Sequence, residues 1–284
     1  VMKLQDEGKI NIRQPLSRFV PELQFGNKAD LTLRDIMAHR AGLYPWIPFY
    51  EQTISEGSNP YPLPAYYSSR RSAAFPSAVT EQLYLRKDFQ DTIWQRLINS
   101  DVSPNKGYVY SDIGFYFIAR MVEEQTGMSI DEYVQETFYQ PLGLQAATYN
   151  PLEKFPKSRI VPTEEDAYWR RQRIHGYVHD MGAAMLDGVS GHAGLFANAQ
   201  DIAIIMQMLL NGGYYGGEQF IQPQTVQTFT TRHPQETRRG IGFDMKQLDG
   251  NRSMNMSSLA SPKTFGHPGF TGTFDELTVE AWVR

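Results

Sequence analysis

The stretch YVYSDIGF places a phenol and a carboxylate two residues apart, at Tyr110 and Asp112. In an extended segment, residues i and i+2 point to the same side, so both side chains would face one cavity. The helical pattern that follows would put them at the positively polarised end of a helix. Nearby cations would favour the phenolate of Tyr110 and make it useful as a base. The structural alternative is that Ser111 or Asp112 caps the helix and Tyr110 is a packed ring.

The stretch FGHPGFTGT, at residues 265–273, places one histidine among small and turn-forming residues. His267 can supply a proton or a positive charge near neutral pH. Gly269 has no Cβ, so a ligand can lie against the backbone there. This pattern favours a strand that forms one wall of a site. The alternative is a β-turn with an incidental histidine.

The remaining histidines carry weaker signals. His175 and His179 are four residues apart, a spacing that would suit a metal ion on a helix. Gly176 lies between them and Gly182 follows, so a helix is not expected and neither is a metal site. His39 lies at the end of an expected helix, where the dipole favours a partial positive charge. We interpret His39 as structural.

Composition places the chain among globular proteins and excludes several functional classes. Its 284 residues, 41% hydrophobic and 20% charged, are enough to bury a sizeable core. The net charge of −4 gives no basic footprint, so no nucleic-acid partner is expected. The absence of cysteine excludes a disulfide scaffold and a thiolate metal site. The longest apolar run, IAIIMQMLL, is too short to span a bilayer, so no transmembrane segment is expected in this chain.

Apolar periodicity predicts helices through most of the chain and strands near its end. We expect helices at 1–8, 31–42, 80–99, 111–127, 129–139, 199–213 and 222–231, and strands at 191–198, 238–245, 263–270 and 276–284. Residues 44–76, rich in Pro, Tyr and Ser, are typical of a long surface loop. This order predicts an α+β fold in a single domain, 1–284. Its helical and loop-rich part would be roughly 30–190 and its sheet-associated part roughly 191–284.

In chain order these pieces resemble the serine β-lactamase and penicillin-binding protein superfamily, in its class C-like branch of D-alanyl-D-alanine carboxypeptidases and esterases. Residues 1–8 look like the end of the nucleophile-bearing helix, and LTLRDIMAHRAGL resembles the next helix. YSD looks like the family's Y-x-N element, VSGHAGLFANAQDIAIIMQMLLNGG resembles a late strand–helix segment, and HPGFTGT looks like its K-T-G or H-T-G strand. The resemblance covers nearly the whole chain. It implies a β-lactamase-like fold, an antiparallel sheet flanked by helices plus a mainly helical subdomain, truncated at both ends.

The resemblance implies acyl transfer without a cofactor. A serine attacks a carbonyl and forms an acyl-enzyme, while a lysine one turn later and the Y-x-N tyrosine share the proton transfer. Carried over, Tyr110 is the acid/base, Asp112 orients substrate or lysine, and His267 stands where the family has Lys or His.

Substrate binding is implied at the end of the same strand. Gly269 would let the acyl group approach, and the N–H of Phe270 would donate to the oxyanion. Pro268 stands where the family has threonine, which removes a hydroxyl and a backbone donor. Thr271 is the candidate replacement for that hydroxyl.

By the resemblance, the catalytic Ser-x-x-Lys pair lies upstream of Val1, and this chain does not contain it. A Ser-x-x-Lys within the chain, Ser103 to Lys106, is flanked by Pro104 and Gly107. It therefore lacks the helix that would put both side chains on one face. We expect the family to be enzymatic and this chain alone to be inactive.

These features together predict a β-lactamase-related serine hydrolase acting on peptidoglycan-type amides or esters. Its substrate would be a small molecule or peptidoglycan-derived, and its location periplasmic or extracellular, by family. VHD and GHAGLF look closest to secreted hydrolases fused to glycoside hydrolase domains, so such a fusion is one expectation. The alternative is a non-catalytic relative that binds cell-wall glycopeptide through the aromatic loop at 44–67.

Overall fold

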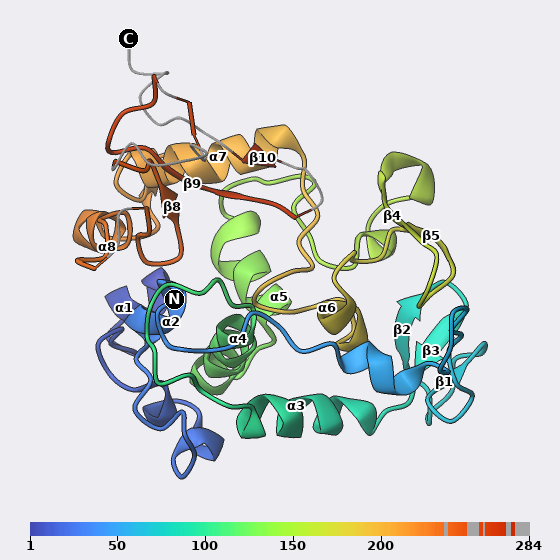
Figure 1. Cartoon of the computed structure of the whole chain (residues 1–284). Helices are drawn as coiled ribbons and strands as arrows, with labels where there is room; N and C mark the ends of the chain where they lie inside the picture. The colour runs from blue at the N-terminus through green and yellow to red at the C-terminus, as the bar shows by residue number, and fades with distance from the viewer. Residues whose placement is uncertain (236–237, 249–255, 258, 271–273, 276–284) are drawn as a thin grey trace.

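The computed structural model describes residues 1–235, 238–248, 256–257, 259–270 and 274–275, where helices combine with short antiparallel strands (Figure 1). The helices are α1 Met2–Asp6, α2 Leu33–Met37, α3 Phe89–Asn99, α4 Ile113–Thr126, α5 Ile130–Val134, α6 Met181–Met185, α7 Ala199–Leu210 and α8 Pro223–Phe229. A π-helical turn, Gln135–Tyr139, continues α5. The α+β class expected from the sequence is confirmed.

The strands form four small antiparallel sheets within the described residues. They are β1 Tyr67–Ser68, β2 Ser77–Thr80, β3 Leu83–Leu85, β4 Pro162–Asp166, β5 Gln172–His175, β6 Tyr214–Tyr215, β7 Glu218–Gln219, β8 Asp244–Met245, β9 Phe265–Pro268 and β10 Phe274–Asp275. One sheet has the order β10-β9-β8. In it Asp244 on β8 pairs with Gly266 on β9. Asp244 therefore lies across from the residue that precedes His267.

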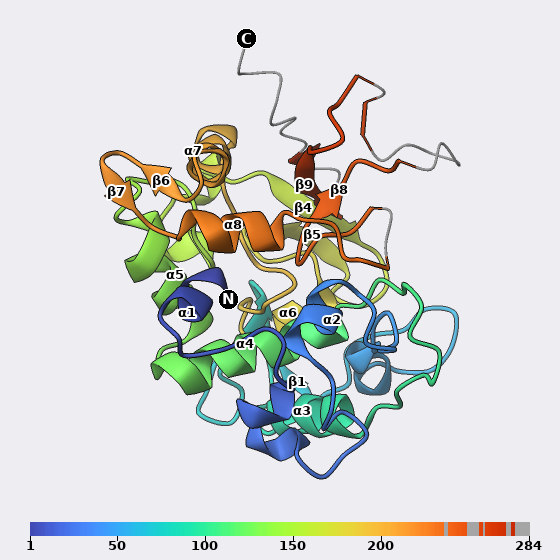
Figure 2. The ribbon, with the colours of Figure 1, turned by 90° about the vertical axis from the view of Figure 1, so that its left-hand side faces the viewer.

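Two hydrophobic clusters hold these elements together. The larger cluster packs α1, α2, α3, α4 and α6 around fully buried side chains such as Leu4, Phe117 and Trp169. The smaller packs α7, α8, β8 and β9 around Met206, Val226 and Phe265. Figures 1 and 2 show α3 below α4, and α7, α8, β8 and β9 above both. Tyr110, which precedes α4, and His267, on β9, therefore come from the two different groups of elements.

Several helix boundaries follow the capping signals in the sequence. The hydroxyl of Thr32 accepts the Asp35 N–H and starts α2. Ser129 and Glu132 form a capping box at α5. Gly127 ends α4 in the left-handed region, with φ of 71°, a conformation that suits glycine.

Three expected elements differ in the structure. Residues 83–85, expected in a helix, form β3 because buried Leu85 pairs with β1 and β2, and α3 begins only at Phe89. The expected strand at 191–198 is wrong, since it contributes an isolated bridge from Phe196 to Thr148. The strand expected at 238–245 is reduced to β8. The strand expected at 276–284 lies outside the described residues.

The second helix is also shorter than expected. It ends at Met37 rather than near Gly42, because His39 adopts a left-handed φ of 56° that no α-helix can continue. Among the described helices, none is long and apolar enough to cross a membrane.

Candidate active site

The rings of Tyr110 and His267 lie next to each other in a tilted arrangement, with centroids 6.1 Å apart and planes inclined by 43°. Tyr110 comes from the loop before α4, and its side chain is 43% exposed. His267 lies on β9 and is half-buried. The structure thus brings together the phenol and the imidazole that the sequence analysis singled out.

Tyr110 is placed by a loop that runs alongside the segment after α2. The N–H of Ser103 donates to the Gly42 carbonyl at 2.8 Å, and the N–H of Asp112 donates to the Pro45 carbonyl at 2.8 Å. Gly42 has a φ of 75°, and a Cβ there would lie 2.5 Å from the Ser103 oxygen. Only glycine fits this close approach, so the chain around Tyr110 follows a fixed path.

The pKa of Tyr110 is raised to about 12, chiefly by burial and then by the charge of Asp112. The guanidinium of Arg239 acts in the opposite direction but is outweighed. The expectation that the phenolate is favoured is therefore wrong for this chain. Near neutral pH Tyr110 is a neutral phenol, which can donate a proton.

The pKa of His267 is shifted in the opposite direction from that of Tyr110. Burial and, second, the charge of Arg239 lower its pKa, while Asp244 raises it in part. Its Nδ1 lies 2.9 Å from the Pro268 carbonyl oxygen. Near neutral pH the imidazole is therefore mainly uncharged and has the charge state of a proton acceptor.

Arg239 is a buried cation between these groups that the sequence reasoning missed. Its side chain forms an ion pair with Asp244 at 2.9 Å and donates to the Tyr108 hydroxyl at 2.9 Å. Its Cζ lies 5.3 Å from the ring centre of Tyr110 and 5.4 Å from that of Tyr108. The signal available was an arginine in the expected strand RRGIGFDM, but a sequence pattern does not distinguish a buried arginine from an exposed one.

His39 also reaches the site. Its ring stacks on Tyr110, with centroids 4.2 Å apart and planes inclined by 24°. Burial, then the charges of Arg239 and His267, lower its pKa to about 3. The expected partial positive charge at this helix end is therefore absent, because an apolar, cation-flanked site disfavours the charged form.

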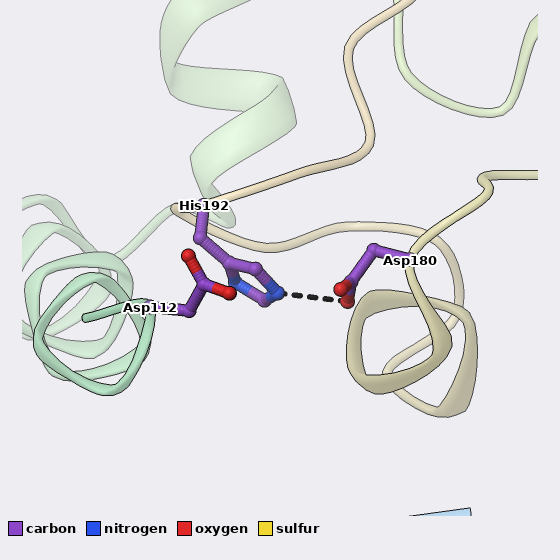
Figure 3. Close-up of side chains that lie close together, drawn as sticks. All are labelled: Asp112, Asp180 and His192. Carbon is purple, nitrogen blue, oxygen red and sulfur yellow. Dashed lines mark hydrogen bonds and ion pairs between the residues drawn. The ribbon is translucent and has the colours of Figure 1, made fainter. Parts of the chain in front are cut away.

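Asp112 faces a second group of side chains (Figure 3). It occupies the N-cap position of α4 but makes no capping hydrogen bond through its side chain. One ligand atom each from Asp112, Asp180 and His192 lies within 4.8 Å of the others. Burial raises the pKa of Asp112, His192 opposes that effect and Asp180 adds to it.

Asp180 and His192 form a hydrogen-bonded chain with Ser190. The His192 Nε2 lies 2.8 Å from Asp180 Oδ1, and its Nδ1 lies 2.9 Å from Ser190 Oγ. The N–H of Ala183 also donates to Asp180 at 2.7 Å. Burial alone would raise the pKa of Asp180, but the bonds from His192 and Ala183 outweigh it and the pKa is lowered.

This group is the one among the described residues whose spacing would suit a metal ion. Both ring nitrogens of His192 are already engaged in hydrogen bonds, so a metal ion would have to displace Asp180 or Ser190. The geometry favours a hydrogen-bonded network over metal ligation. His175 and His179 do not form a second group, since His175 contacts the Ile160 carbonyl and His179 contacts Glu164.

The expected substrate-binding residues are described only in part. Gly269 and Phe270 follow β9 and are exposed. The Phe270 side chain is 91% exposed and its ring lies 5.3 Å from that of His179. Thr271 lies outside the described residues. Ser103 belongs to a loop, where its hydroxyl accepts the Asn105 N–H at 3.2 Å, so it has no helical partner at Lys106.

Comparison with known proteins finds related sequences. The sequence profile described as Beta-lactamase matches residues 1–276. A protein of Salmonella agona (strain SL483) named "Putative D-alanyl-D-alanine carboxypeptidase" is 33% identical over 98% of this chain. The alignment spans 62% of that relative, so the chain covers about three-fifths of the length of the curated relatives it matches.

Solved structures share the fold at lower identity. A penicillin-binding protein homologue from Caulobacter crescentus aligns with a TM-score of 0.57 and 18% identity, covering 94% of this chain and 67% of that one. A class C β-lactamase aligns with a TM-score of 0.55 and 14% identity, covering 86% and 55%. The profile match over residues 1–276 and the 33% identical relative show that the chain belongs to the β-lactamase family.

Proposed function

We propose that this protein is a β-lactamase-related serine hydrolase that works through an acyl-enzyme on peptidoglycan-type amides or esters. The observation that carries the proposal is the meeting of Tyr110 and His267, 6.1 Å apart, at the Tyr-x-Asp and His-Pro-Gly motifs. The curated relatives named as D-alanyl-D-alanine carboxypeptidases favour acyl-D-alanine peptides within that substrate class. Neither a cofactor nor a nucleic acid takes part in the proposed reaction.

The charge states near pH 7 suggest how the groups divide the work. Tyr110 holds its proton and can give it to the leaving amine or alkoxide as the bond between that group and the carbonyl carbon breaks, and the proton that the serine loses on attack then returns to Tyr110. His267 is neutral and can accept a hydrogen bond from substrate or nucleophile. Asp112, anionic beside α4, offers a partner for an ammonium group. The N–H of Phe270, just past β9, is the candidate oxyanion donor.

The nucleophile is proposed to come from a Ser-x-x-Lys on a helix that leads into α1. Ser103 and Lys106 do not replace it, because they lie in a loop and the pair needs one helical face. We therefore propose that the 284-residue chain alone is inactive. Periplasmic or extracellular location and fusion to a glycoside hydrolase domain remain part of the proposal, as expected from the resemblance.

The test compares the natural full-length protein with single variants. A fluorescent penicillin or a fluorophosphonate should label it covalently, and it should release D-alanine from an acyl-D-Ala-D-Ala peptide or hydrolyse a p-nitrophenyl ester. Tyr110→Phe should lower kcat by about 10²–10⁴-fold. Tyr214→Phe is the matched control, since Tyr214 is similarly exposed at 46% but lies on β6. Equal effects of the two variants, or no labelling of the full-length protein, would refute the proposal.

A second candidate function rests on exposed aromatic side chains in the loop at 44–67. Tyr44, Trp46 and Tyr61 are 52%, 55% and 53% exposed, and such rings can stack on sugars or glycopeptides. A non-catalytic binding module would bind a muropeptide without hydrolysing it, and Trp46→Ala would weaken binding in calorimetry. Covalent labelling of the full-length protein at a serine would support the hydrolase and exclude the non-catalytic binding module.

A further inference from the structure

His39 holds both chain neighbours of Tyr110 and also stacks on its ring. Its carbonyl oxygen accepts the Val109 N–H at 3.0 Å, and its Nδ1 accepts the Ser111 N–H at 3.0 Å. The two rings lie 4.2 Å apart. We propose that His39 is a positioning residue that fixes Tyr110 for proton transfer through these two bracketing hydrogen bonds. The catalytic part of this inference rests on the proposed function, whereas the positioning part does not.

The backbone conformation of His39 allows it to make both hydrogen bonds. Its φ of 56° lies in the left-handed region, which non-glycine residues seldom adopt and where histidine, asparagine and aspartate are enriched. This conformation ends α2 at Met37. It also lets the carbonyl and the ring of one residue reach the same loop on either side of Tyr110. A left-handed residue at this position is a common way to end a helix, but such an end does not require the ring.

The protonation state of His39 is set by its bonds and by its surroundings. Because Nδ1 accepts a hydrogen bond from Ser111, the proton of the neutral ring lies on Nε2. Burial together with the charges of Arg239 and His267 lowers the pKa of His39 to about 3. The bond to Ser111 therefore persists across the pH range in which a hydrolase works. In a protonated ring, Nδ1–H would face the N–H of Ser111, and two donors cannot form a hydrogen bond.

The Nε2–H of His39 is a buried donor without a hydrogen-bond acceptor among the described residues. His39 itself is only 3% exposed. A buried donor without an acceptor is unfavourable, so an apolar ring would be the better choice for packing alone. The retained imidazole is explained by the acceptor that its Nδ1 provides to Ser111.

Two substitutions separate the hydrogen bonds from the ring stack. His39→Asn keeps a side-chain acceptor and tolerates the left-handed conformation, but it removes the ring. His39→Phe keeps a ring against Tyr110 but leaves the Ser111 N–H without its acceptor. The readout is the carbon-13 signal of Tyr110 in the 284-residue chain labelled at tyrosine Cζ, assigned by its loss in Tyr110→Phe.

We expect His39→Asn to leave the Tyr110 signal narrow and to lower its pKa less than His39→Phe does, even though the covering ring is lost. His39→Phe should broaden the signal and move the pKa downward toward the ordinary tyrosine value near 10, since a loosened ring is better hydrated. The opposite ranking, equal shifts in both variants, or no shift in either would overturn the inference. If His39→Phe does not fold, a scalar coupling across the hydrogen bond between Ser111 N and His39 Nδ1 in the wild type decides the matter, and its absence refutes the bond.

The catalytic role of His39 is tested by steady-state kinetics of the full-length protein. His39→Phe should lower kcat roughly tenfold or more at nearly unchanged KM, because a misplaced acid affects the transition state more than binding, and His39→Asn should restore most of the rate. A lower rate caused by a higher KM alone would overturn the catalytic role. If the wild type shows no hydrolysis, the proposed function fails, while the Tyr110 signal still tests the positioning role.

Discussion

Arg239 and Asp244 form a buried ion pair, with 2.9 Å between Nη1 and Oδ1, beside the imidazole of His267. Both side chains are 2% exposed. The cation lowers and the anion raises the pKa of His267, and the same two charges act with the same signs on Tyr110. The pair therefore adjusts the pKa of both groups that face the site, beside the larger effect of burial.

Asp244→Asn should move both pKa values downward. The cation of Arg239 would then act on His267 and Tyr110 with less compensation. NMR titration of the labelled rings measures the shifts, and Arg239→Met should shift both pKa values upward. Either single change leaves a buried charge less well paired and should lower the free energy of unfolding by about 3 kcal/mol or more. Shifts of the two rings in opposite directions within one variant would contradict this arrangement.

Asp112 and Asp180 should respond to pH in opposite ways, because their pKa values are shifted in opposite directions. The lowered pKa of Asp180 stabilises the fold above the ordinary carboxyl value of about 3.9, and this stability is lost as the pH falls through the folded-state value. The raised pKa of Asp112 makes its ionisation unfavourable. Stability is therefore lost as the pH rises from about 3.9 through the folded-state value.

At pH 7, Asp180→Asn should therefore lower the free energy of unfolding, and Asp112→Asn should raise it. Urea unfolding at pH 7 and near pH 3 measures both. The gain from Asp112→Asn should vanish at the lower pH, where the wild-type carboxyl is protonated. A gain that stays constant with pH would show that the charge of Asp112 is not its cause.

The sequence identified the two candidate rings of the site but not the residues that surround them. Tyr110 and His267 were found because each lies in a short motif with turn-forming or helix-starting neighbours, and the structure brings them to 6.1 Å. Arg239 and His39 were missed or misjudged because their roles depend on burial. A cation's effect on a pKa is set by desolvation and distance, which chain spacing does not encode.

The same distinction applies to the fold. Helices with long apolar stripes, such as α4 and α7, match their expected ranges closely, because a 3.6-residue period is a local signal. Residues 83–85 became a strand through pairing with β1 and β2, partners that the local pattern does not reveal. The expected strand at 191–198 failed for a different reason, since Gly194, with a φ of 118°, interrupts the extended backbone.

Gly114 sets how closely α4 approaches α2, and with it the distance between the loops that hold Tyr110 and His39. A Cβ at Gly114 would lie 2.3 Å from Ile36 Cγ2, closer than van der Waals contact allows. Replacing a helix-interior glycine by alanine ordinarily stabilises a protein by roughly 0.5–1 kcal/mol. Gly114→Ala should instead lower the free energy of unfolding by about 1–3 kcal/mol, because overpacking separates the helices.

The double variant with Ile36→Ala identifies the cause. Ile36→Ala alone should destabilise the protein by about 2–5 kcal/mol, since it leaves a cavity in the core. With the Ile36 methyl gone, the Cβ at position 114 would fill part of that cavity, so the double variant should be more stable than the sum of the single effects predicts. Urea denaturation of the four proteins gives this coupling. Strict additivity would mean that the contact between Gly114 and Ile36 does not control the approach of α2 to α4.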